Sequence, residues 1–207
     1  MKPHEIEQQS FAMIDAEAGP HGFSPKQWQI VRRMIHTSAD FEYLTSVRIH
    51  PRAVAAGIQA LRRRGTIYTD TNMARTGIRT RDLATFGGRV QCLMASDRIK
   101  HIAADAGITR AEAAVDEVAG SLDDTIYVVG NAPTALFRLI ALIQRRTAAP
   151  ALVIGLPVGF VNAAESKAAL LDLDIPYITN VGRKGGSNVA ASVVNALILL
   201  ALEDHVK

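Results

Sequence analysis

The chain has one cysteine and no long apolar run, and each shortage excludes a class of protein. A single cysteine, Cys92, rules out an internal disulfide and a cysteine-based zinc cluster. It lies in the apolar run 90–94, so we expect a buried small hydrophobe. The longest apolar stretch, residues 196–202, is far shorter than the roughly 20 residues of a membrane-spanning helix. The first nine residues lack the apolar core of a signal peptide. We therefore expect a soluble, cytoplasmic protein with no membrane partner.

The chain also lacks a strong excess of charge. It carries 23 Lys and Arg against 20 Asp and Glu, a net charge of +3. This balance favours an acidic partner only weakly. The cluster Arg62–Arg64 is the one stretch that resembles a nucleic-acid patch. Cations just before a glycine, here Gly65, are ordinary complements to the dipole of a helix C-terminus. We therefore expect no nucleic-acid partner.

Several sequence motifs of known chemistry are absent. The Gly-x-Ser-x-Gly turn of serine hydrolases, the Gly-x-Gly-x-x-Gly dinucleotide fingerprint and the phosphate loop do not occur. No second histidine stands at metal-ligand spacing from His36, so no protein-bound metal is expected. Only the general α/β pattern supports the hypothesis of a nucleotide-dependent oxidoreductase.

The hydrophobic pattern predicts one domain, residues 1–207. The 48% hydrophobic content is enough for a sizeable core. Apolar spacing and caps (Ser24 with Pro25, Thr109 with Glu112) alternate helices with strands. This alternation predicts a three-layer α/β/α sandwich with a mainly parallel sheet. The last helix is apolar almost all round, so it should be buried against the sheet or a second subunit. We expect helices at about 5–17, 25–37, 51–64, 98–106, 109 onward, 133–146, 163–171 and 188–203, and strands at 66–69, 90–94, 125–129, 151–154 and 176–181.

Three predicted strands each lead into a glycine turn and then a helix. The turns begin at Gly130, Gly155 and Gly182. Parallel strands gather such turns at one sheet edge, where free amides and helix N-termini favour anions. The sequence thus predicts a site for a small acidic molecule, although each glycine also fits a plain tight connection. In the last turn Arg183 and Lys184 add positive charge.

Other charged residues are candidates for the same site. His36, near a helix C-terminus and three and four residues after Arg33 and Arg32, is a candidate proton donor. On spacing alone, a solvated or core histidine at a helix end is the favoured alternative. Arg110 opens a capped helix, where a cation is unfavourable, so it is either solvated or a carboxylate clamp. Glu165 and Lys167 follow the second turn; they either approach the crevice or lie on a solvated helical turn.

Taken together, five segments in order give a specific resemblance. They are residues 33–36, 70–73, 130–136, 157–167 and 182–187. With them, essentially the whole chain resembles the precorrin-8X methylmutase family. The resemblance implies an isomerase of cobalamin biosynthesis that moves a methyl group from C-11 to C-12 of precorrin-8X or cobalt-precorrin-8, giving hydrogenobyrinate or cobyrinate. It further implies His36 as the catalytic acid, which donates a proton or hydrogen bond to the macrocycle.

The resemblance also implies the substrate contacts. A polyanionic macrocycle requires donors at its rim and an apolar floor. Asp70 is a caution, because a carboxylate beside a polyanion must face away, bond amides or remain protonated. The implied substrate-binding residues are Ser10, Arg33, Asp70, Met73, Arg110, Gly130, Asn131, Ala132, Pro157, Val158, Gly159, Glu165, Lys167, Gly182, Arg183, Gly185 and Gly186.

Residues 37–43, with 70–73, resemble the cobalt-dependent branch of the family more closely. On that interpretation the substrate is cobalt-precorrin-8, and cobalt arrives inside the macrocycle. No external cofactor and no protein ligand for cobalt are implied. The resemblance implies a homodimer and allows transient contacts with neighbouring pathway enzymes. The alternative is a non-catalytic corrinoid carrier of the same pathway.

Overall fold

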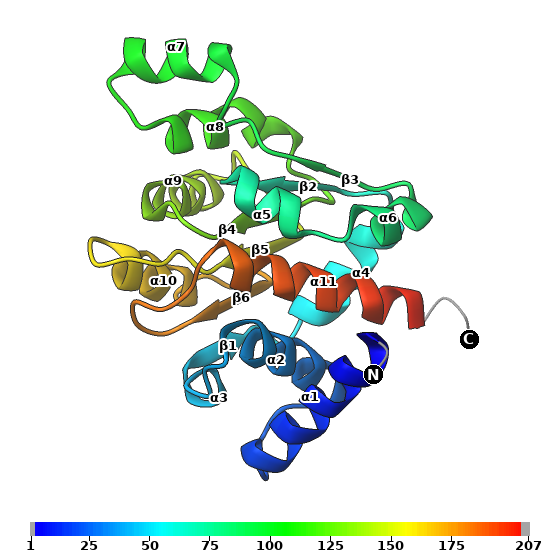
Figure 1. Ribbon diagram of the computed structural model, residues 1–207. Helices are drawn as coiled ribbons and strands as arrows, with labels where there is room; N and C mark the ends of the chain where they lie inside the picture. The colour runs from blue at the N-terminus through cyan, green and yellow to red at the C-terminus, as the bar shows by residue number, and fades with distance from the viewer. Residues whose placement is uncertain (1–2, 204–207) are drawn as a thin grey trace.

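A computed structural model describes residues 3–203 of the chain. Within this range the predicted strands and helices are present, and short helices at Tyr43–Ser46, Asn72–Gly77 and Thr80–Leu83 are added where the sequence predicts none (Figure 1). The strands are β1 (Val47–Ile49), β2 (Thr66–Thr69), β3 (Arg89–Gln91), β4 (Ile126–Val129), β5 (Leu152–Gly155) and β6 (Tyr177–Asn180). The helices are α1 (Pro3–Ala18), α2 (Pro25–Ser38), α3 (Tyr43–Ser46), α4 (Ala53–Arg62), α5 (Asn72–Gly77), α6 (Thr80–Leu83), α7 (Asp97–Ala106), α8 (Arg110–Val118), α9 (Pro133–Gln144), α10 (Ala163–Leu171) and α11 (Ser187–Glu203), with short 3₁₀ turns η1 (Ala84–Phe86) and η2 (Ala119–Ser121).

The described strands form one sheet in the order β1-β6-β5-β4-β2-β3. All neighbouring pairs are parallel except β1 with β6, which is antiparallel. The predicted mainly parallel sheet is therefore confirmed. The edge strand β1 is not predicted from the sequence, because three residues carry too little pattern to mark a strand.

Alternate residues of each strand face two helical layers. On β4 and β5, Ile126, Val128 and Ile154 pack into a core shared with α2, α4 and α11, whereas Tyr127 and Val153 pack into a core shared with α8 and α9. Helix α11 runs across the first face and contacts α2, α4 and α5 (Figure 1). The last helix is thus buried within the chain itself, as the first of the two predicted alternatives states.

Local sequence rules set the helix starts that matter for the site. Ser24 and Gln27 form a capping box at α2, and Thr109 and Glu112 form another at α8. At the far end of α2, Ala39 takes the left-handed conformation (φ 53°) and stops the helix one turn after His36.

Two predictions about the apolar run 90–94 need correction. The strand ends at Gln91, because β2, its neighbour in the sheet of the described residues, ends at Thr69 and the chain then turns, with Ser96 N donating to the Leu93 carbonyl. As a result Cys92 lies past the strand and is only partly buried.

Two further features concern the basic cluster Arg62–Arg64 and the question of a membrane-spanning helix. Arg62 donates to the carbonyl of Ala201, and Arg63 is paired with Asp124 at 3.0 Å, so both guanidinium groups have partners within the chain. Among residues 3–203, no helix combines the length and the apolar character needed to cross a membrane.

The turn at Gly130 positions the start of α11. A Cβ atom at Gly130 would lie 2.7 Å from the Cα of Ser187, which is the first residue of α11. Because backbone atoms stand in the way, no side-chain rotation would relieve the overlap. A glycine is therefore required where the β4 turn meets α11.

We predict that Gly130→Ala lowers the free energy of unfolding by about 1–3 kcal/mol, since overpacking against backbone forces a shift of α11. Gly120→Ala is the matched control, because its Cβ would meet nothing within 4 Å. Urea unfolding of both variants checks this. Equal stability of the two variants would contradict the close approach.

Candidate active site

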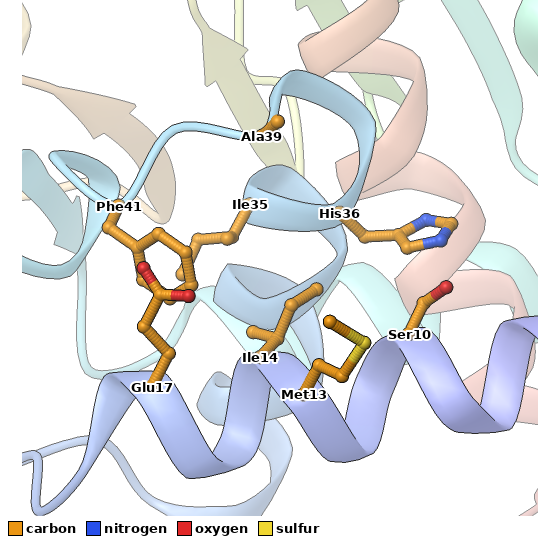
Figure 2. A pocket seen from close by; sticks show the side chains of 8 residues that line it. All are labelled: Ser10, Met13, Ile14, Glu17, Ile35, His36, Ala39 and Phe41. Carbon is orange, nitrogen blue, oxygen red and sulfur yellow. The ribbon is translucent and has the colours of Figure 1, made fainter.

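His36 lies on the last turn of α2 and borders a hollow of about 500 Å³ between α1 and α2. Its side chain is exposed, and its ring centroid is 5.1 Å from that of Phe11. Figure 2 shows Ser10 and His36 at the same end of this hollow, with the Ser10 hydroxyl pointing toward the side where the imidazole lies. The hollow is lined by Ser10, Met13, Ile14, Glu17, Ile35, His36, Ala39 and Phe41. An accessible imidazole beside an apolar hollow is suited to proton or hydrogen-bond donation to a bound ring.

The predicted partners of His36 are held by contacts between α1 and α2. Arg33 pairs with Glu7 at 3.1 Å, and its guanidinium carbon lies 5.1 Å from the centre of the Phe11 ring. The guanidinium carbon of Arg32 lies 4.3 Å from the centre of the same Phe11 ring. The Ser10 hydroxyl donates to the Ile6 carbonyl at 2.8 Å. Both arginines thus fix α1 on α2, and α1 supplies one wall of the hollow.

Sequence reasoning missed most of the walls of the His36 hollow. Met13, Ile14 and Glu17 follow Ser10 at helical spacing, so the interpretation of Ser10 as a site residue was enough to indicate them. Phe41 offered no such signal, because it follows the left-handed residue Ala39, where the chain changes direction.

Asp70 binds the turn that was expected to bind the substrate. Its carboxylate accepts hydrogen bonds from the amides of Gly130 (2.9 Å), Asn131 (2.8 Å) and Ala132 (2.7 Å). The side chain is buried, and this burial raises its pKa, an effect that the three amide donors oppose. Of the three alternatives for this carboxyl group, the structure therefore shows that it bonds amides.

This arrangement changes what the Gly130 turn can offer. The turn does hold an anion at a helix N-terminus, but the anion belongs to the chain. The amides of Gly130, Asn131 and Ala132 are already used. Substrate contact at these three positions stays a prediction, and it would have to involve other atoms, such as the exposed side chain of Asn131.

A second, smaller hollow of about 270 Å³ lies beside Asp70 at the same edge of the sheet. It brings together Asp70 and Arg110, which the resemblance implies as substrate-binding residues, and it adds Thr71, Asn72, Met94 and Ala95. Arg110 is exposed, so its charge can face a ligand here. Met73 lies next to this hollow in sequence and is 71% exposed, but it does not line the hollow.

The second and third glycine turns lie against each other. Gly159 N donates to the Arg183 carbonyl at 3.1 Å, and Gly186 N donates to the Leu156 carbonyl at 2.8 Å. Gly185 approaches so closely that a Cβ there would overlap the Leu156 carbonyl oxygen. The Arg183 guanidinium carbon lies 5.5 Å from the centre of the Phe160 ring. The predicted residues Gly159, Arg183, Gly185 and Gly186 are thus brought together.

Several apolar side chains stay exposed on these turns. Phe160 is 84% exposed and Val161 is 78% exposed, and Val158 and Val181 are close to half exposed. Pro157 is buried, Gly182 is half-buried and Glu165 is exposed. A group of exposed apolar residues on adjoining loops is typical of a surface that contacts a ligand or another protein.

Lys167 is fully buried, so the alternative that it lies on a solvated helical turn is wrong, while its contact with substrate stays a prediction. Its ammonium group donates to Asn180 Oδ1 at 3.1 Å and to the Lys184 carbonyl at 2.5 Å. Burial lowers its pKa to about 8. A neutral amine keeps two N–H donors, which is enough for both acceptors. Lys167 therefore holds the third glycine turn from its buried side.

The charge of Lys184 is used within the chain as well. Its ammonium group pairs with Asp40 at 2.5 Å and with Glu42 at 2.8 Å, both in the segment that follows α2. These two ion pairs join the third glycine turn to the segment just after the helix of His36.

No metal centre is formed by the described part of the chain. Within residues 3–203, no three side chains of the His, Cys, Asp and Glu types lie close enough together to hold a metal ion. His205 lies outside the described residues.

We predict that Lys167 makes stability rise with pH between about pH 8 and pH 10.5. In this window the unfolded chain holds the lysine proton and the folded chain does not, so folding is favoured as pH rises, by up to about 3 kcal/mol in total. Urea unfolding at several pH values should show this rise relative to Lys167→Met. Lys100→Met, at an exposed lysine, should keep the wild-type slope. A difference between wild type and Lys167→Met that is flat or falls with pH would contradict the buried position.

Comparison with known proteins places these observations in a family. The family model described as precorrin-8X methylmutase matches residues 5–200. The chain is 44% identical over 201 residues to a cobalt-precorrin-8 methylmutase of Priestia megaterium, which covers 97% of this chain and 89% of the relative. It is 45% identical over 203 residues to a cobalt-precorrin-8 methylmutase of Salmonella typhimurium, covering 95% of each chain.

A solved structure agrees with these sequence matches. The fold superposes on the crystal structure of a precorrin-8X methylmutase from Thermus thermophilus with a TM-score of 0.90, at 46% identity and with 97% of each chain covered. At this coverage the match takes in the sheet and both helical layers. On sequence and structure together, this chain belongs to the precorrin-8X methylmutase family, whose members are isomerases that move a methyl group within one molecule.

Proposed function

We propose that the chain converts cobalt-precorrin-8 to cobyrinate by moving a methyl group from C-11 to C-12 of the ring. The observation that carries the proposal is an accessible imidazole, His36, beside an apolar hollow in a chain that matches methylmutases over almost its full length. The names of the two bacterial relatives, and the similarity of residues 37–43 to the cobalt branch, favour the cobalt-loaded substrate over precorrin-8X. Cobalt belongs to the substrate, and the chain needs no cofactor of its own.

In the reaction the bond from the methyl carbon to C-11 breaks and a bond to C-12 forms, so no atom is gained or lost. His36 donates a proton or hydrogen bond to the macrocycle as its double bonds rearrange, and recovers it afterwards. When cobalt occupies the ring nitrogens, His36 acts on the macrocycle by hydrogen bonding and position. Holding the ring beside one acid can supply much of the rate, because the proton donor is then already in place when the double bonds rearrange.

The acetate and propionate arms of the substrate meet cations at the rim. Arg110 and Arg183 are exposed at the carboxyl edge of the sheet, and arginine binds carboxylates in a two-point geometry. Arg33 joins them when a substrate carboxylate replaces Glu7 as its partner. The apolar floor is supplied by Met13 and Ile14 of the His36 hollow.

The enzyme acts as a homodimer. The two hollows, of about 500 and 270 Å³, are lined by different residues, and each is small beside a whole tetrapyrrole with its arms. The exposed apolar side chains of Phe160 and Val161 are suited to burial against a second copy, which would complete the enclosure. The enzyme works in the cytoplasm, where transient contact with neighbouring pathway enzymes would transfer the product to the next enzyme.

A non-catalytic corrinoid carrier would need the same hollows but no acid. No relative reported above is named as a carrier, and an exposed histidine is unnecessary for carriage alone. Single-turnover conversion separates the two functions, because a carrier returns its ligand unchanged.

We predict that His36→Ala slows single-turnover methyl transfer by roughly 100-fold or more, since a positioned general acid contributes about 10²–10⁴-fold. Binding of the product corrinoid, followed by its visible spectrum after gel filtration, should change only a few-fold. His101→Ala is the control, at an exposed histidine of α7 outside both hollows. Equal turnover of the two variants would remove His36 from its role.

We also predict that the enzyme converts cobalt-precorrin-8 faster than precorrin-8X when each is supplied separately at equal concentration. The product of each reaction is identified by mass and visible spectrum. Faster conversion of the metal-free substrate would contradict the assignment to the cobalt branch, while conversion of neither would contradict the methylmutase function.

A further inference from the structure

Lys184 joins two parts of the molecule that the sequence separates by more than a hundred residues. Its ammonium group contacts Asp40 Oδ2 at 2.5 Å and Glu42 Oε2 at 2.8 Å. Asp40 is further held by the amide of Glu42, which donates to Asp40 Oδ1 at 3.0 Å. The two carboxylates and the ammonium group therefore form one compact cluster, which we call the Lys184 clasp.

The clasp includes a residue of the loop that forms one wall of the His36 hollow. Ala39 and Phe41 both line this hollow, and Asp40 is the residue between them. Figure 2 shows Ala39 and Phe41 along the loop that closes the side of the hollow opposite Ser10. Whatever fixes Asp40 therefore also fixes the loop that forms this wall, one turn beyond His36.

The other end of the clasp is anchored in the core. The Lys184 carbonyl accepts from Lys167 Nζ at 2.5 Å and from Asn180 Nδ2 at 3.0 Å, and both of these side chains are buried. The neighbouring residue Gly186 donates its amide to the Leu156 carbonyl. Lys184 is thus held by its backbone to the sheet and by its side chain to the wall of the hollow.

The exposure of the clasp argues against a role in stability alone. The side chains of Lys184, Asp40 and Glu42 are 45%, 27% and 52% exposed, and ion pairs this exposed add little to folding because water and salt screen them. Their geometric effect is larger, because a small displacement of a catalytic wall can slow a reaction that depends on position.

We propose that Lys184 is a positioning residue for methyl transfer, which holds the Ala39–Phe41 wall of the His36 hollow at a fixed place relative to the third glycine turn. This inference rests on the proposed function for its effect on rate, but not for its effect on structure. Asp40 and Glu42 are the acceptors of the clasp, and Lys167 with Asn180 is its anchor.

The test compares Lys184→Met, Lys184→Arg and Lys100→Met in the full-length chain. Lys184→Arg keeps a cation at the clasp, and Lys100→Met removes a similarly exposed lysine (50% against 45%) that is paired with Asp97 on α7. Hydrogen exchange of the amides of residues 36–42 reports the wall without any substrate. Single-turnover rate and product binding report the consequence, and urea unfolding reports global stability.

In Lys184→Met we expect the amides of residues 36–42 to exchange hydrogen several-fold faster than in wild type. The turnover rate should fall about 10-fold, with product binding and global stability little changed. Lys184→Arg should bring the exchange and turnover rates most of the way back to wild type, and Lys100→Met should match wild type. Unchanged exchange in Lys184→Met overturns the clasp, whatever its rate. Faster exchange with unchanged turnover overturns the positioning role. If wild type itself fails to turn over, the proposed function fails, while the exchange result still decides the clasp.

Discussion

The hydrogen bonds between the Asp70 carboxylate and three consecutive amides are the interaction on which the candidate site depends. A parallel sheet ends in turns whose amides have no partner, and leaving them buried and unpaired costs free energy. Here one buried carboxylate satisfies the amides of residues 130–132 and so joins the end of β2 to the start of α9. The smaller hollow, which Asp70 and Arg110 help to line, lies beside this connection.

The same principle governs the other two turns. Gly159 and Gly186 use their amides on carbonyl groups of the chain, and the Lys184 carbonyl is taken up by the buried side chains of Lys167 and Asn180. These backbone groups therefore set the shape of the edge and leave much of the recognition to side chains. Exposed arginines and an exposed imidazole are the groups that remain available to an acidic macrocycle. This differs from the cradle of backbone amides that the glycine pattern alone favours.

Features governed by local rules could be predicted from the sequence. The bounds of α10 and the caps at Ser24 and Thr109 follow from residues within a few positions of each other. Strand β1 was missed because three residues carry too little pattern to mark a strand. Spacing could not show that Lys167 is buried, or which of three alternatives applies to Asp70, because both depend on contacts between different elements of the fold. The resemblance indicated the position of His36, but the partners of Arg33 and Lys184 depend on how helices pack.

The central claim is that a carboxylate-bearing corrinoid lies against His36 with its arms at the arginine-lined edge. A crystal structure of the protein with bound product tests this most directly. The account predicts the macrocycle over the hollow of Ser10 and His36, an imidazole nitrogen within hydrogen-bonding distance of the ring system, and at least one arm on Arg110 or Arg183. A product bound away from His36, with its arms on other residues, would contradict it.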